Sequence, residues 1–132
     1  MVAAKRHEPP VTRIPSLHHV MIAIPQHGEA LARDFYIGTL SLEEIQKPPA
    51  LAQRGGLWVS TGAIDVHLGV DPNFVPALKA HIALVVDDLD TFRARLIAGQ
   101  FIPGPIEFEL PGFRRCYVDD PFGNRIELMQ AR

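Results

Sequence analysis

The stretch HIALVVDDLD, residues 81–90, decides the fold, because the chain carries a weaker copy of its opening as HVMIAI at residues 19–24. The histidines that open the two copies, His19 and His81, lie 62 positions apart. Each copy starts as an aliphatic strand and continues into a segment whose apolar residues have helical spacing, over 29–40 and 88–99. A strand and a helix repeated at one offset indicate that the chain is built from two related halves.

A second pair of similar strands closes each half. Residues 64–69 read IDVHLG and residues 124–129 read NRIELM, and aligning their aliphatic positions sets His67 on Glu127, at an offset of 60 positions. Shorter strands are expected between the opening and closing strands, at 42–46, 57–60, 106–110 and 113–118. The sequence therefore predicts an α+β fold in which two βαβββ repeats form a curled mixed sheet around a metal-binding cavity.

The expected organisation is a single domain that follows a tail. Residues 1–14, MVAAKRHEPPVTRI, combine prolines with charged side chains and are predicted to be flexible. Residues 15–132 are predicted to form one domain, with repeat one at about 16–70 and repeat two at about 79–130.

Composition excludes several classes of function. The chain has 13 basic and 15 acidic residues that are mixed along its length, so no clustered basic face for nucleic acid is expected. No apolar run reaches the roughly 18 residues that span a bilayer, and the start lacks a signal peptide's apolar stretch. The one cysteine, Cys116, cannot form an intrachain disulfide, as in a reducing compartment. We expect a cytoplasmic protein that acts on a small molecule, with no nucleic acid or membrane partner.

Strand alternation places one potential metal ligand in each of four strands, on the face opposite the bulky aliphatic residues. These candidate ligands are His19, His81, His67 and Glu127. If the two halves pack about a pseudo-two-fold axis, the four side chains converge. Imidazole and carboxylate ligands at about 2.0–2.2 Å suit zinc. A mixed nitrogen and oxygen set with open positions also suits iron, manganese, nickel or cobalt.

Each candidate ligand has a simpler structural interpretation. The two opening histidines could be half-buried strand residues. Glu127 could instead form a salt bridge with Arg115 or Arg125, because a buried carboxylate needs a partner. His67 could be a ligand, or it could be a hydrogen-bonding residue or general base, since an ordinary imidazole has a pKa of about 6.5.

Four other residues are considered for binding a substrate or an anion. Tyr117 and Arg115 share a strand face, where a phenol could donate to an oxyanion and a guanidinium could hold a carboxylate or phosphate. An exposed sheet edge is the alternative for both. Trp58 could line the pocket or pack in the core. Arg54, next to two glycines, could lie in an anion-binding loop or in a solvated one.

Three segments together resemble the vicinal oxygen chelate superfamily, which contains glyoxalases, bleomycin resistance proteins and extradiol dioxygenases. They are LHHVMIAI at 17–24, HIALVVDDLD at 81–90 and YVDDPFGNRIEL at 117–128. The resemblance covers about residues 16–130, so the domain at 15–132 is expected to be glyoxalase-like. It implies metal ligands at the two opening histidines and Glu127, with a variable fourth ligand at His67. It also implies a homodimer, often with the site built between subunits.

The resemblance implies a metal-dependent, glyoxalase-like lyase or isomerase. Its small substrate would chelate the metal through adjacent oxygens, and the metal would act as a Lewis acid that stabilises an enolate. Glu127 or His67 would move the substrate proton. Two positions depart from the family pattern: glyoxalases commonly have a carboxylate at the position of His67 and a glycine at that of Ser41. The alternatives are a fosfomycin-resistance-type thiol transferase and a non-catalytic, bleomycin-resistance-like binding protein, although the latter branch generally lacks these ligands.

Overall fold

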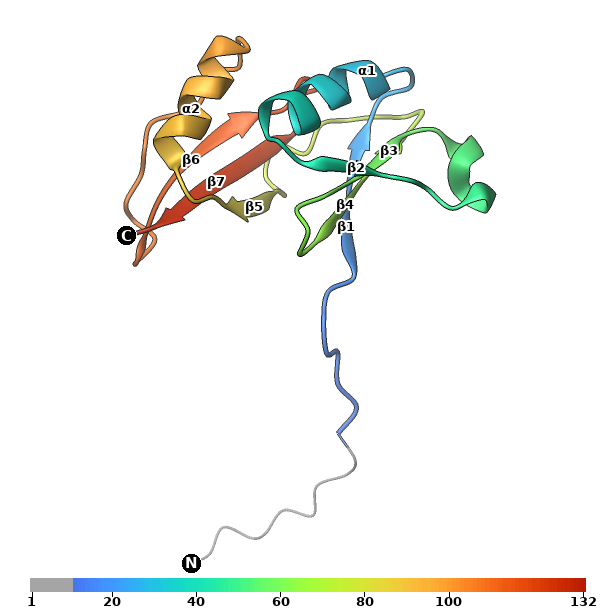
Figure 1. Cartoon of the computed structure of the whole chain (residues 1–132), viewed down its shortest axis with the longest axis horizontal. Helices are drawn as coiled ribbons and strands as arrows, with labels where there is room; N and C mark the ends of the chain where they lie inside the picture. The colour runs from blue at the N-terminus through green and yellow to red at the C-terminus, as the bar shows by residue number, and fades with distance from the viewer. Residues whose placement is uncertain (1–10) are drawn as a thin grey trace, which may run out of the picture.

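The structure, a computed structural model, describes residues 11–132, so most of the predicted tail lies outside the described residues. Residues 11–18 form no helix or strand, are exposed, and lead away from the body of the molecule (Figure 1). Within the described part of the chain, no helix combines the length and apolar content that crossing a bilayer requires.

The first half contains a four-stranded sheet with the order β1-β4-β3-β2. Its strands are β1 His19–Ile24, β2 Glu43–Ile45, β3 Leu57–Ser60 and β4 Asp65–Val70. β1 pairs in parallel with β4, and the other pairings are antiparallel. The predicted strands at 19–24 and 57–60 are confirmed residue for residue, whereas the predicted strand at 42–46 is shorter in the structure.

The second half contains a three-stranded sheet with the order β5-β7-β6. Its strands are β5 Ile82–Val85, β6 Phe113–Asp119 and β7 Arg125–Ala131. The prediction of a full strand at 106–110 was wrong, because only an isolated bridge joins Glu107 to Arg115. Pro105 and Pro111 flank this segment, and a proline has no amide hydrogen to give to a ladder.

The two sheets share a pairing pattern. Val20 lies opposite Val66 in the parallel pair β1 and β4, and Ile82 lies opposite Ile126 in the parallel pair β5 and β7. The residue that follows Val66 on β4 is His67, and the residue that follows Ile126 on β7 is Glu127. Both are proposed ligands. The α+β class with mixed sheets is therefore confirmed, and its strands are divided between two sheets.

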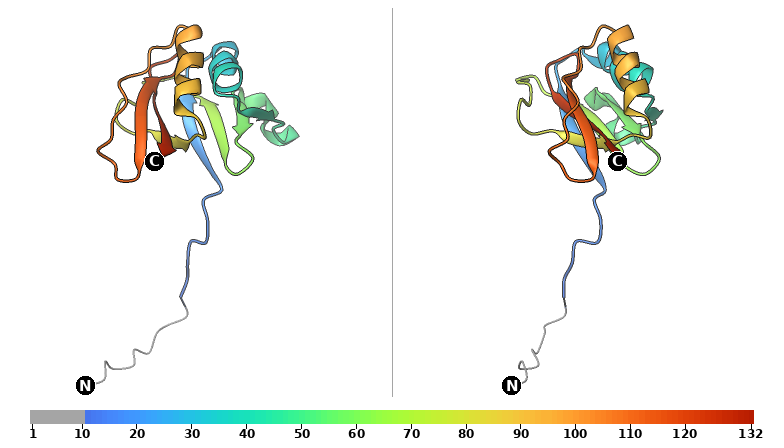
Figure 2. Two further views of the ribbon diagram at one scale, coloured as in Figure 1. Left: turned by 60° about the vertical axis from the view of Figure 1, so that its left-hand side comes forward. Right: turned by 90° about the vertical axis from the view of Figure 1, so that its left-hand side faces the viewer.

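Two helical stretches lie side by side on one face of the sheets (Figures 1 and 2). They are α1 Glu29–Ala32, which continues into the π-helical segment η1 Arg33–Thr39, and α2 Leu89–Ala98. The 3-10 segment η2 Pro49–Arg54 lies apart from them. The aliphatic strand faces pack beneath α1, η1 and α2, and Val66, Leu68, Ile126 and Leu128 are buried there. The opposite strand faces remain available for a site.

The two predicted helices differ in how they end. Asp88 caps α2 by accepting from the backbone nitrogen of Thr91 at 3.1 Å, and Gly99 is the C-cap residue. After η1, Ser41 adopts a left-handed φ of 64°. Glycine adopts this conformation at lower cost, which explains why the family pattern has glycine there. Arg95 Nη1 donates to Ser41 Oγ at 3.0 Å.

Candidate functional site

The strongest pairing among the predicted site residues joins His81 and Glu127. His81 immediately precedes β5, and its Nε2 lies 2.9 Å from Oε1 of the buried Glu127 on β7. The other ring nitrogen, Nδ1, lies 2.8 Å from the carbonyl oxygen of Lys79. A carbonyl can only accept, so Nδ1 carries a hydrogen. Nε2 then faces a carboxylate oxygen, and a proton or a metal cation must lie between them.

Arg115 holds the second oxygen of Glu127. Its Nη1 donates to Glu127 Oε2 at 3.2 Å, and the same guanidinium lies 3.9 Å from the carboxylate of Glu107. The bond to Glu127 raises the pKa of Arg115. Of the two salt bridges considered for Glu127, the one with Arg115 is present. Arg125 instead lies over the ring of Tyr117, 3.7 Å from its centroid.

Tyr117 belongs to the same group of side chains. It lies directly opposite Glu127 in the antiparallel pair β6 and β7, and its ring meets His81 edge to face with the centroids 5.4 Å apart. Two predicted substrate-binding residues, Tyr117 and Arg115, therefore contact the two predicted ligands of the second half. β6 is an edge strand of its sheet, as the alternative for these residues required, but both side chains are half-buried.

The first half brings together the other two predicted ligands. The ring of His67 is stacked between Trp58 and His19, with centroid distances of 3.8 Å and 4.0 Å. Burial lowers the pKa of His67, and the neighbouring His19 lowers it further. Both effects favour the neutral imidazole, the form that binds a metal or accepts a proton. His18 lies against His19 with their Nδ1 atoms 3.0 Å apart.

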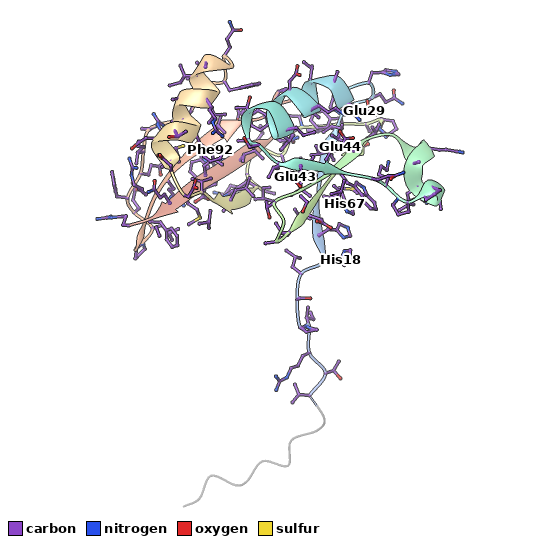
Figure 3. The ribbon with its side chains drawn as sticks, viewed as in Figure 1. His18, Glu29, Glu43, Glu44, His67 and Phe92 are labelled. Atoms are coloured by element: carbon purple, nitrogen blue, oxygen red, sulfur yellow. The ribbon has the colours of Figure 1, made fainter. Side chains whose placement is uncertain are left out.

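A cavity of about 420 Å³ opens beside this stack, on the side of the sheet away from α1, where Figure 3 shows His67 and His18. Trp58 lines this cavity, which is one of the two positions that its sequence context allowed. Its other lining residues are His18, His19, Met21, Lys47, Leu51, Arg54, Gly55, His67, Leu68, Gly69 and Val70.

Sequence analysis missed Lys47 as a residue of this cavity. The signal was present in the strand register, because Ile45 pairs with Trp58 across β2 and β3. Strand alternation places the residue two positions later on the same face as Ile45. Lys47 is that residue, although the regular strand has ended by then.

The four predicted ligands form two pairs rather than one cluster. Within residues 11–132 of one chain, no three histidine, cysteine, aspartate or glutamate side chains gather closely enough to hold a metal ion. His19 lies with His67, and His81 lies with Glu127. A common site for all four remains a prediction.

The donor atoms nevertheless fit a divalent ion. Two neighbouring ligands at about 2.1 Å from an octahedral ion lie about 3 Å apart. The separation of 2.9 Å between Nε2 of His81 and Oε1 of Glu127 matches this spacing. The bond from His81 to the carbonyl of Lys79 is the kind of outer contact that fixes a metal-binding imidazole. His81 and Glu127 could therefore supply two of the ligands that a divalent ion needs.

Comparisons with known proteins place the chain in a family. No protein-family model matches it, and no curated protein matches it. Among solved structures, a glyoxalase family protein from Bacillus anthracis is 41% identical, with a TM-score of 0.87, over 93% of this chain and 100% of that one.

More distant structures share the fold. A member of the glyoxalase/bleomycin resistance protein/dioxygenase superfamily from Sphaerobacter thermophilus DSM 20745 is 25% identical over 87% of this chain and 97% of that one, with a TM-score of 0.69. The fosfomycin resistance protein FosX from Mesorhizobium loti is 17% identical over 91% and 95%, with a TM-score of 0.68, and shows the fold alone. By its likeness to the Bacillus anthracis protein, this chain belongs to the glyoxalase family of the vicinal oxygen chelate superfamily.

Proposed function

We propose that the protein is a metal-dependent, glyoxalase-like lyase or isomerase that acts on a small oxygen-chelating substrate. The observation that carries this proposal is the contact of His81 Nε2 with Glu127 Oε1 at 2.9 Å. Because the carbonyl of Lys79 fixes the hydrogen on the other ring nitrogen, this gap is suited to a cation. Zinc, nickel, manganese, cobalt and iron all accept such a ligand pair.

We propose further that a second copy completes the site, with His19 and His67 from one chain and His81 and Glu127 from the other. Three features support this arrangement. The matching strand registers give each half one ligand pair. The pairs are not joined within residues 11–132 of one chain. Met21 and Val85, on β1 and β5, are 62% and 69% exposed, so both opening strands have an apolar side chain that a second copy could cover.

The chain's own residues divide the remaining work. A divalent ion, when bound, supplies Lewis-acid polarisation of a substrate carbonyl. The ion would be held by His19, His81 and Glu127, so His67, whose pKa is lowered by burial, is free to accept a proton from substrate carbon and return it. Arg115 holds the Glu127 carboxylate in place, and the Tyr117 hydroxyl can donate to a substrate oxygen in which negative charge develops.

Elemental analysis of purified protein tests the metal. We expect the wild-type protein to hold divalent metal and His81→Ala and Glu127→Gln to lose it. Glu107→Gln is the matched control, because Glu107 also meets Arg115 but does not face His81. Equal metal content in all four proteins would reject the site.

Proton exchange tests the chemistry. Exchange at the α-carbon of a panel of α-hydroxyketones, followed by NMR in deuterated water, should require the metal and be lost in His67→Ala. Full exchange in chelator-treated protein would contradict the proposal. Tight ligand binding by the metal-loaded protein without exchange or product would favour a binding protein of the bleomycin-resistance kind.

A further inference from the structure

We propose that the cavity beside Trp58 binds a small organic anion with an apolar body, and that Lys47 and Arg54 select its charge. This inference rests on the proposed function, because it names the substrate class of the same site. The cavity volume of about 420 Å³ is in the range of small-molecule pockets.

The charge of the lining carries the inference. Lys47 and Arg54 line the cavity together with three histidines, and within the described part of the chain no aspartate or glutamate lines it. The whole chain, by contrast, has more acidic than basic residues, 15 against 13. Among residues 11–132, neither cation forms a salt bridge. Two permanent cations in a concave surface without a carboxylate attract an anionic ligand.

The backbone beside these cations is held in place. Lys47 Nζ donates to the carbonyl oxygen of Gly55, and Gly56 N donates to Glu29 Oε2 at 2.9 Å. Gly56 has a φ of 76°, and a Cβ at this position would lie 2.1 Å from the carbonyl oxygen of Leu68. The loop that follows Arg54 therefore packs directly on β4. The ammonium of Lys47 is anchored by a neutral carbonyl, which leaves its charge uncompensated.

The rest of the lining is apolar and indicates the ligand's body. Trp58, Leu51, Met21 and Val70 supply this surface. A ligand with an anionic head and a short hydrocarbon body would meet both parts of the lining. A bare inorganic anion would meet only the cations, so we expect it to bind more weakly.

Trp58 makes the cavity directly observable, because it is the chain's only tryptophan and its fluorescence reports on this site. The probes are hexanoate, its neutral counterpart hexanamide, and inorganic phosphate. Each is titrated into wild-type protein that has been dialysed against EDTA, at pH 8, where an ordinary imidazole is neutral. The variants are Lys47→Gln and Arg54→Gln. Arg95→Gln, which removes a cation from α2, is the control.

We expect saturable binding of hexanoate that is about 10-fold tighter than that of hexanamide and of phosphate. Lys47→Gln and Arg54→Gln should each weaken hexanoate several-fold and leave hexanamide unchanged, and Arg95→Gln should change neither. Equal affinity for hexanoate and hexanamide, no saturable response to hexanoate, or unaltered binding in both cavity variants would overturn the inference. Since the metal is removed, these results are independent of the metal analysis, and either proposal can fail alone.

Discussion

Tyr36 and Asp120, 84 positions apart in the chain, form a buried hydrogen bond of 2.7 Å between the phenol oxygen and carboxylate Oδ2. Burial raises the pKa of Tyr36 far above its ordinary value, and the adjacent carboxylate adds to the effect. Asn124 Nδ2 donates to the same carboxylate and to the carbonyl oxygen of Ala23, both at 2.9 Å. These bonds tie η1 and β1 of the first half to the turn before β7 in the second.

The first prediction concerns this bond. Tyr36→Phe should lower the free energy of unfolding by roughly 1.5–3 kcal/mol, because it removes a buried hydrogen bond to a charged group. Urea denaturation measures the change. Tyr117→Phe is the control and should stay within about 0.5 kcal/mol, since its hydroxyl has no hydrogen-bond partner in the described part of the chain. Equal effects of the two changes would show that the bond contributes nothing specific.

The second prediction compares two glycines with positive φ. Gly56→Ala should destabilise the fold by more than about 2 kcal/mol, because its Cβ would meet the Leu68 carbonyl oxygen at 2.1 Å. Gly62 has a φ of 95°, but no atom of residues 11–132 lies within 4 Å of the place that a Cβ would take, so Gly62→Ala bears only the backbone strain, about 1 kcal/mol. Thermal unfolding separates the two. A Gly56→Ala protein as stable as Gly62→Ala would contradict the packing of this loop.

The third prediction concerns acid. The hydrogen bond from Gly56 N lowers the pKa of Glu29 below 4.5, its ordinary value. The carboxylate therefore contributes stability above the unfolded-state pKa, and this contribution is lost as the pH falls through the folded-state pKa.

Urea unfolding of wild-type protein at successive pH values should thus show stability falling below about pH 4.5. Glu29→Gln keeps an acceptor for Gly56 but cannot titrate, so its curve should be flatter in this range. Glu43→Gln, which removes an exposed carboxylate, is the control. A Glu29→Gln curve as steep as that of the wild-type protein would assign the acid sensitivity to other groups.

The fourth prediction tests the shared metal site by mixing two inactive proteins. In a mixed dimer of His19→Ala and Glu127→Ala chains, both defects fall in one site and the other site is intact. Random exchange of equal amounts should then restore about a quarter of the wild-type metal content. Elemental analysis after mixing measures it, and each variant alone is the control. A site built within one chain would give no recovery.

The sequence was sufficient to predict the fold class and most strands, for a physical reason. Ile, Val and Leu alternate on one face of β1, β4, β5 and β7, and helical segments follow β1 and β5, a pattern that indicates strands packed under helices. The predicted strand at 106–110 was lost because Pro105 and Pro111 break the ladder. The turn of η2 was not predicted, since Pro49–Arg54 carries no apolar periodicity.

The site was predictable one half at a time. Strand parity placed Tyr117 and Arg115 on one face, and the ion pair of Glu127 with Arg115 was one of two alternatives that the sequence left open. Strand alternation cannot tell whether the two ligand pairs meet within one chain or between two chains, because that depends on how exposed surfaces such as that of Met21 pack. Alternation from Ile45 would have placed Lys47 on the cavity face, but the sequence did not show that β2 ends at Ile45 and that the Gly55 carbonyl orients Lys47.

The division of the proposed ligands between two halves of the chain has a consequence for how the protein would be handled. A binding centre assembled from two molecules obeys mass action, so its occupancy rises and falls with protein concentration. At the low protein concentrations of an assay, the metal content per chain would then be low, whereas concentrated stocks of the same sample would have every site occupied.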